Sequence, residues 1–206
     1  MPGTAAVAIW CDVDPAIKDE YDDWHAHEHT PERLAIPGFL RGSRWVSVDG
    51  RDSYFILYEL DALEVLTAGP YLERLNHPTP WSIKMMPHHR NMVRSLCRVQ
   101  SSAGIGLGEL MLTIRLAQSP DADLIPKLPA RKGLVAAHLL RDAGAVQGAP
   151  TTEQKIRGGD LAADWIVLVN GYGIDAVTQA AAELGGDAPG SIARTYRLAY
   201  VVSARA

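Results

Sequence analysis

The sequence predicts an α+β fold made of two tandem βαββαβ repeats, on three observations. First, strand-like and helix-like segments follow each other in the same order in both halves of the 206-residue chain. Second, residues 54–63 and 165–174 are alike, because in each an almost continuously apolar strand leads directly into a helix. Third, a Ser- and Gly-rich segment without periodicity separates the halves. We expect a first repeat at 1–101, a linker at 102–108 and a second repeat at 109–206.

In the first half, apolar runs and prolines define the expected elements. A buried strand is expected at 5–11, and Asp14-Pro15 then begins a helix, with Asp14 as N-cap and proline at the first helical position. Thr30-Pro31 should interrupt this helix, because a prolyl ring removes a backbone donor. The remaining elements are expected as strands at 39–48 and 54–60, a helix at 62–86 broken at its prolines, and a strand at 89–99.

The second half repeats this order. We expect strands at 110–116, 134–140, 165–170 and 195–203, and helices at 121–128 and 174–184. A βαββαβ unit places both helices on one face of an antiparallel sheet, so the other face needs a cover. The two sheets can cover each other, within one chain or between two chains, and a closed two-sheet barrel is the economical arrangement.

Composition narrows the range of partners. The formal net charge of −4, without a cluster of Lys and Arg, argues against nucleic acid. No apolar run is long enough to cross a bilayer, and the first residues lack the pattern of a secretory leader. Cys11 and Cys97 fall inside expected strands, which favours reduced thiols in a core. We expect a cytoplasmic protein that binds a small molecule, does not contact membranes and can form a homodimer.

The densest group of titratable residues is the segment 24–29, Trp-His-Ala-His-Glu-His. On an α-helical projection, Glu28 falls on the same stripe as Trp24, so a carboxylate occupies a core-facing position. Burying a carboxylate is costly unless it is paired, protonated or at the wall of a wet cavity. Glu28 is therefore the least ordinary residue of the sequence.

Two histidines flank this carboxylate. His25 and His29 lie four residues apart beside Glu28, whereas His27 points to the other side. Imidazole titrates near neutrality, and a neighbouring carboxylate fixes its tautomer and raises its pKa, which suits general acid–base catalysis. We predict His29 as the proton carrier, Glu28 as the orienting or second acid–base group, and His25 as support.

Two other interpretations of these residues stay open. In the first, Glu28 pairs with an arginine of the sheet, Arg44 or Arg90, and only fixes the helix. In the second, His25, Glu28 and His29 follow the His-x-x-Glu-His spacing of one class of zinc peptidases. Those enzymes have a different fold and need a third protein ligand for zinc, so we predict no bound metal.

Further residues are expected to contact a substrate. Tyr58 interrupts an apolar strand and can point its hydroxyl into the cavity, or it can be an ordinary core tyrosine. Trp81 lies in a turn-rich segment that can form a lid or a surface loop. His88 and His89 lie on opposite faces of the closing strand, so only one of them faces the cavity. The predicted substrate-binding set is Trp24, Tyr58, Trp81, His88, His89 and Arg90.

Three motifs of the first repeat point to a known family: Trp24-His-Ala-His-Glu-His-Thr-Pro-Glu-Arg33, Pro37-Gly-Phe39 and His88-His-Arg-Asn91. They resemble the dimeric α+β barrel superfamily, particularly its EthD-like branch. The resemblance implies two tandem ferredoxin-like repeats whose antiparallel sheets pack as a dimeric α+β barrel. The second repeat lacks the histidine cluster, so we expect it to be a structural partner.

This superfamily includes small-molecule cyclases, isomerases, lyases, dehydratases and cofactor-free monooxygenases, while some members bind haem and others have no known activity. The resemblance therefore implies the fold better than the reaction. The sequence has no fingerprint for a nucleotide, flavin or pyridoxal cofactor, and we predict none. We expect an isomerase, cyclase, dehydratase or lyase that acts on a carbonyl or aromatic compound by His/Glu acid–base chemistry. The alternatives are a non-catalytic binding or assembly protein, and haem- or metal-dependent oxygen chemistry.

Overall fold

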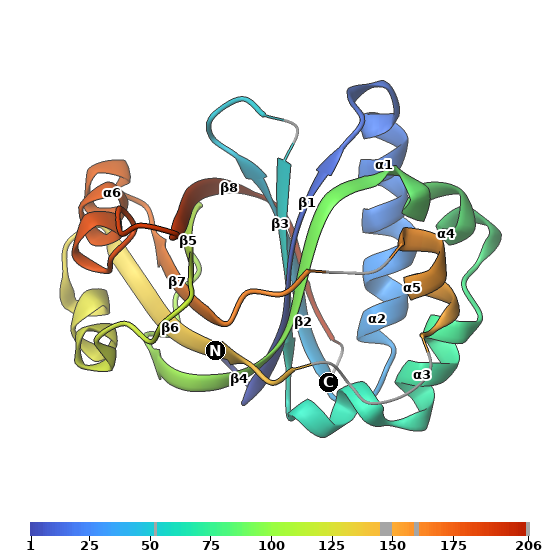
Figure 1. Ribbon diagram of the computed structural model, residues 1–206, viewed down its shortest axis with the longest axis horizontal. Coiled ribbons are helices and arrows are strands. Elements are labelled where there is room, and N and C mark those ends of the chain that lie inside the picture. Colours follow the sequence, from blue (N-terminus) through green and yellow to red (C-terminus); the bar gives the residue numbers. More distant parts are fainter. Residues whose placement is uncertain (52, 145–149, 159–160, 205–206) are drawn as a thin grey trace.

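Apolar runs of the sequence form eight antiparallel strands in the part of the chain that the computed structural model describes, residues 1–51, 53–144, 150–158 and 161–204. These strands form one closed barrel, in the order β1-β3-β2-β8-β5-β7-β6-β4, with β4 pairing back to β1 (Figure 1). Their bounds are β1 (Ala5–Val13), β2 (Phe39–Ser47), β3 (Ser53–Leu60), β4 (His89–Ala103), β5 (Leu110–Leu116), β6 (Leu134–Asp142), β7 (Trp165–Gly171) and β8 (Ile192–Ser203).

Helices cover the outside of the barrel on two opposite sides. One side carries η1 (Pro15–Ile17), α1 (Lys18–Trp24), η2 (His25–His29), α2 (Thr30–Leu34), η3 (Leu63–Thr67), α3 (Gly69–Asn76), α4 (Pro80–Met85), η4 (Met86–His88) and α5 (Thr152–Arg157). The other side carries η5 (Ala122–Ala130) and α6 (Ile174–Glu183). Figure 1 shows that α5, although it follows β6 in the chain, lies with α1–α4. Among the described residues, no helix has the length and apolar character needed to cross a bilayer.

Strands β1, β3 and β7 are buried on both faces, because the interior and the outer helices both present apolar side chains, whereas β4 and β8 are partly exposed. Along β3, Phe55 faces the interior, while Ile56 and Tyr58 face the helices around η2. Trp10 on β1 crosses the interior and donates a hydrogen bond from Nε1 to Thr113 Oγ1 on β5 at 3.0 Å. The interior is therefore one core shared by the two halves of the sequence.

The expectation of two ferredoxin-like repeats with separate packed sheets was wrong. Strand β2 pairs with β8 and β4 pairs with β6, so hydrogen bonds join the two halves edge to edge into a single barrel. This pairing leaves no free sheet edge between the halves, whereas two separate sheets would each expose rows of unpaired backbone groups. The division of the chain at 102–108 stays a prediction, and Ser102 and Ala103 continue β4.

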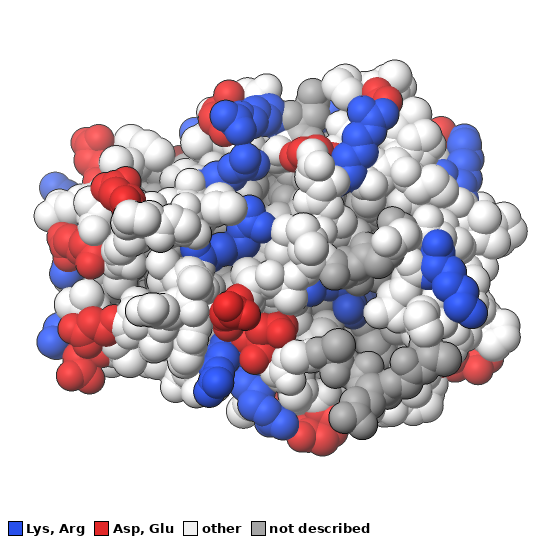
Figure 2. All heavy atoms as spheres, viewed as in Figure 1, with Lys and Arg blue, Asp and Glu red and all other residues white. Residues whose placement is uncertain are grey.

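Most elements lie within a few residues of their predicted bounds. Asp14 caps η1 by accepting a hydrogen bond from the Ala16 N–H at 3.0 Å, with Pro15 at the start of the helix, as expected. Cys11 and Cys97 are buried free thiols in β1 and β4. The short helix α5 was not foreseen. Figure 2 shows basic and acidic side chains interspersed on the viewed face of the molecule.

One close approach between sheet and helices depends on a glycine. A Cβ atom at Gly42 on β2 would lie 2.7 Å from Thr30 Cγ2 and 3.2 Å from Tyr58 Cδ1. Both distances are shorter than an ordinary van der Waals contact, so a side chain at this position would push α2 away from the barrel.

Gly42→Ala should therefore lower the free energy of unfolding by about 1–3 kcal/mol, as overpacking does in other cores. The measurement is urea unfolding followed by tryptophan fluorescence. Gly69→Ala is the matched control, because nothing lies within 4 Å of its Cβ position. A Gly42→Ala protein as stable as the Gly69→Ala control would contradict the close approach of Thr30.

His138 on β6 is a buried histidine far from the helices around η2, and its Nδ1 lies 2.8 Å from Ser102 Oγ. Burial first, and then the positive charges of the N-terminus and Arg41, lower the pKa of His138 to about 3. A histidine in an unfolded chain titrates near pH ~6.5. Below that pH the unfolded state binds more protons than the folded state, so stability is lost as the pH falls toward the folded pKa.

We expect the wild type to lose about 2 kcal/mol more stability than His138→Gln between about pH 7.5 and about pH 5. The glutamine keeps a polar group near Ser102 and does not titrate. Urea unfolding curves of both proteins at the two pH values measure the difference. Equal losses in the two proteins would show that His138 does not control the acid sensitivity.

Candidate functional site

The segment that contains the histidine cluster folds as a π-helix, η2, between α1 and α2. The Thr30 N–H bonds to the His25 carbonyl, five residues back, so each turn holds one residue more than an α-helix. The helix continues through Pro31, which lies in the first turn of α2, where a missing N–H is tolerated. The expected interruption is therefore replaced by a local change in helical winding.

The π-turn changes which residue lies over Trp24. With five residues in the turn, the ring of His29 stacks on Trp24 in the place expected for Glu28, with centroids 4.5 Å apart. Glu28 is only half-buried, so its expected core-facing position was wrong. His25, at the start of the π-turn, is 2% exposed.

Next to His25, a cavity of about 40 Å³ lies between the outer face of the first-half strands and η2, α2, α3 and α5. Its apolar wall comes from the strands, α3 and η4, through Val7, Ile9, Phe39, Ile56, Leu75 and Met86. Its polar wall includes His25, His29, Arg33, Tyr58, His89 and Glu153. The combination of an apolar wall and a few buried polar groups is typical of small-molecule sites.

His25 is held by Thr30 and is neutral. Its Nδ1 lies 3.0 Å from Thr30 Oγ1, and its Nε2 is buried without a hydrogen-bond partner among the described residues. Burial first, followed by the positive charges of Arg44, His89 and Arg33, lowers the pKa of His25 well below 6.5. An uncharged imidazole therefore presents its second nitrogen at the cavity wall.

Two further polar groups in this wall have unused hydrogen-bonding capacity. Arg33 is 4% exposed; its Nη2 donates to Glu153 Oε1, and its Nη1 is buried without a partner in the described part of the chain. The Tyr58 hydroxyl is buried without a hydrogen bond of normal geometry to any described residue. Burial raises the pKa of Tyr58 to about 12, and the nearby Thr30 hydroxyl opposes this rise.

Two other histidines line the cavity. The ring of His29 stacks on Trp24 with centroids 4.5 Å apart and lies 5.7 Å from the ring of His25. His89 Nδ1 donates to the Met86 carbonyl at 3.0 Å, so in the neutral ring Nε2 accepts from the Tyr21 hydroxyl at 3.0 Å. His89, and not His88, is therefore the histidine of the closing strand that faces the cavity.

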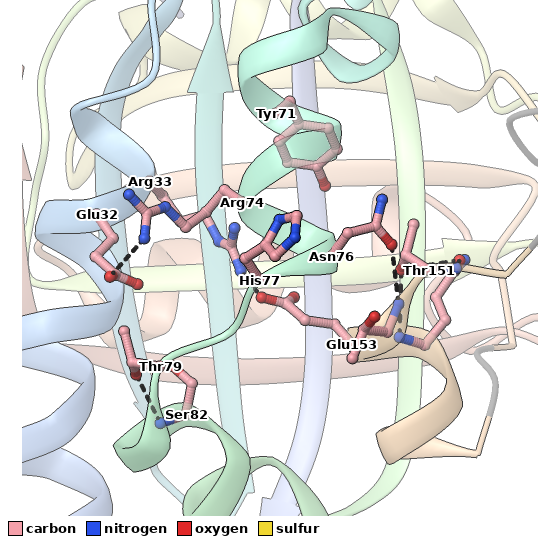
Figure 3. A network of polar contacts seen from close by, with 12 residues as sticks. Glu32, Arg33, Tyr71, Arg74, Asn76, His77, Thr79, Ser82, Thr151 and Glu153 are labelled. Atoms are coloured by element: carbon pink, nitrogen blue, oxygen red, sulfur yellow. Dashed lines mark hydrogen bonds and ion pairs between the residues drawn. The ribbon is translucent and has the colours of Figure 1, made fainter.

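The remaining residues of the predicted site lie outside the cavity wall. Glu28 Oε1 accepts a hydrogen bond from Thr79 Oγ1 at 2.6 Å and so ties η2 to the start of α4. Trp24 Nε1 donates to Ser82 Oγ of α4 at 3.2 Å. Figure 3 shows Thr79 and Ser82 together beside the larger polar network. These contacts position the helix layer around the cavity.

The arginines considered as partners of Glu28 bind other carboxylates. Arg44 Nη1 lies 3.2 Å from Asp22 Oδ1, and Arg90 forms an exposed ion pair with Asp14 at 2.5 Å. Trp81 belongs to α4 and not to a loop, and its Nε1 donates to Glu20 at 3.2 Å. Neither Trp81 nor Arg90 lines the cavity.

The residues that the sequence did not identify are Thr30, Arg33 and Glu153. Arg33 ends the first family motif, yet nothing in the sequence indicated that its guanidinium is buried. Glu153 reaches the cavity from α5, and its only sequence signal is the capping box Thr151-x-x-Gln154 that begins this helix. Within the described residues, no three His, Cys, Asp or Glu side chains are grouped as metal ligands.

Comparisons with known proteins show similar folds without close sequence relatives. No protein-family model and no curated protein matches the chain. The crystal structure of an anthrone oxidase-like protein aligns over 98% of this chain and 94% of its own, with 14% identity and a TM-score of 0.66. A putative monooxygenase from Fusobacterium nucleatum aligns over 98% and 96%, with 9% identity and a TM-score of 0.61.

A third structure, a putative monooxygenase from Lactobacillus acidophilus, aligns over 97% of this chain and 96% of its own, with 9% identity and a TM-score of 0.54. At such low identities the likeness shows the fold alone. The EthD-like branch and the tandem duplication stay predictions. The chain shares its fold with monooxygenase-like and anthrone oxidase-like α+β barrels.

Proposed function

We propose that the protein is a small-molecule enzyme that removes a proton from an acidic C–H group of an aromatic ketone and stabilises the resulting enolate. One observation supports this above all. Buried polar atoms of His25, Arg33 and Tyr58, for which no described residue is a hydrogen-bond partner of normal geometry, line one largely apolar cavity. Unsatisfied buried polar groups are rare in native proteins, so their gathering at one cavity indicates a ligand with a polar atom there.

His25 has the properties of the base in this reaction. It is neutral at physiological pH, so the Nε2 lone pair is available when Nδ1–H donates to the Thr30 hydroxyl. The substrate C–H bond breaks, its proton moves to Nε2, and the electron pair passes to the ketone oxygen. The enolate formed beside the ring then stabilises the imidazolium by charge attraction.

Arg33 and Tyr58 are suited to hold the developing oxyanion. The Arg33 Nη1–H and the Tyr58 O–H are donors already fixed in a water-poor site, so they need little reorganisation when charge develops. Arg33 and Arg44, whose charges disfavour a proton on His25, favour a negative charge on the substrate. In this scheme Thr30 orients the histidine, a role that the sequence had given to Glu28. The role of His29 as a proton carrier stays a prediction.

The fate of the enolate separates two candidate reactions. Reprotonation or elimination would give the isomerase, dehydratase or lyase activity expected from the sequence. Reaction with oxygen is the second candidate, and the anthrone oxidase-like and putative monooxygenase names of the similar structures favour it. For anthrone, one molecule of oxygen would convert the ketone to anthraquinone and water.

Anthrone is therefore a suitable probe for both steps. Under argon in deuterium oxide, the wild type should speed deuterium uptake at the acidic methylene carbon, measured by NMR. His25→Asn should reduce this rate roughly 100-fold, because general acid–base catalysis contributes about 10²–10⁴-fold. His27→Asn is the matched control, since His27 is exposed on the same turn. In air, oxygen consumption by the same proteins distinguishes oxidation from reprotonation.

Two outcomes would contradict the proposal. Undiminished exchange in His25→Asn would remove His25 from the reaction, and anthrone binding without exchange in the wild type would favour a non-catalytic binding protein. Glu28→Gln, measured in parallel, tests the role predicted from sequence. A loss equal to that of His25→Asn would place Glu28 in the catalytic group.

A further inference from the structure

We propose that α5 is a lid over the cavity, and that its Glu153 carboxylate occupies the place on Arg33 that a carboxylate of the substrate takes when the lid opens. The inference rests on the proposed function in one respect, that this cavity is the substrate site. It narrows the substrate to an aromatic ketone that also carries a carboxylate group.

The lid helix comes from a distant part of the chain and is held by side-chain contacts with α2 and α3. It has six residues, follows β6, and lies beside α3 on the first-half side of the barrel. Its first N–H, from Thr152, donates to Asn76 Oδ1 of α3 at 3.2 Å, and Ile156 packs against the apolar cluster of that side. Figure 3 shows side chains of α2, α3 and α5 meeting in one polar network. A helix of this length does not hold its conformation alone, so its place depends on such contacts.

The ion pair between Arg33 and Glu153 lies in the cavity wall. The two side chains are 5% and 3% exposed. Buried ion pairs seldom stabilise a fold more than apolar residues of the same size would, whereas removing one partner is strongly destabilising. Arg33 therefore requires an anion, but nothing requires that the anion be Glu153.

The cavity must widen before a ring can enter, and in this proposal α5 is the element that moves. An apolar cavity of about 150 Å³ holds benzene, and the volume here is about 40 Å³. Among the described residues, Glu153 is the only acid in the wall, and Arg33 is its partner there. Withdrawal of α5 would leave an excess of positive charge, and an incoming carboxylate would restore the balance. A neutral ligand would not.

Removing the Glu153 charge tests whether a substrate carboxylate replaces Glu153 on Arg33. Glu153→Gln should bind 1-naphthoate at least about tenfold more tightly than the wild type, which corresponds to about 1.4 kcal/mol. The neutral 1-naphthamide should show no such gain, and the double variant Arg33→Gln/Glu153→Gln should lose it. Isothermal titration calorimetry measures all affinities. Glu73→Gln is the matched control, because it removes one exposed carboxylate of α3.

A second variant leaves the ion pair intact. Asn76→Ala removes the anchor of the first N–H of α5, so it should tighten naphthoate binding about threefold by making the open form less costly. This variant keeps the test valid if Glu153→Gln does not fold. The proposal is overturned if neither variant tightens naphthoate binding, or if naphthamide gains as much as naphthoate.

The naphthoate experiment tests the lid, and the anthrone experiment tests the proposed reaction, so each proposal can be refuted separately. Anthrone exchange by the wild type, without a gain of naphthoate affinity in the variants, would refute the lid and leave the proposed function intact. The opposite result, a carboxylate-specific gain without exchange of either anthrone or an anthrone carboxylic acid, would refute the proposed reaction and leave the anionic binding site in place.

Discussion

Hydrogen bonding between the two halves of the sheet is the constraint on which the rest of this structure depends. Because β2 pairs with β8 and β4 with β6, every strand has a neighbour on both sides. Closure places one face of each strand inside the barrel, so only the outer face can hold a ligand site under a helix layer. The cavity lies on this outer face, over β1 and β3, and not in the barrel interior.

The two helix layers differ in a way that explains why one of them holds the site. On the second-half side, η5 and α6 pack apolar residues such as Ile125, Leu128 and Val177 against the strands. On the first-half side, α1 leads into η2 and places His25 in the corresponding layer, and α5 adds a carboxylate from the other half of the chain. The buried ion pair of the first-half helix layer, Arg33 with Glu153, thus forms where α5 joins that layer.

The electrostatic character of the cavity follows from this burial. Arg33 and Arg44 are both buried next to His25, and their charges add to desolvation in keeping the imidazole neutral. The same charges attract an anion, which at present is the Glu153 carboxylate. The ion pair lies in the cavity wall, and in the proposed exchange it marks the place of a ligand carboxylate.

The sequence by itself determined the strands, the cap at Asp14 and the histidine-rich turn, because these depend on local patterns of apolar, proline and capping residues. Tertiary structure decided the rest. The π-turn placed His29 instead of Glu28 over Trp24, since it breaks the constant rotation that a helical projection assumes. Glu153 entered the cavity from 120 residues away, and the barrel closed between strands far apart in the chain. No local pattern encodes such contacts, because they are set by which surfaces meet after the strands have paired.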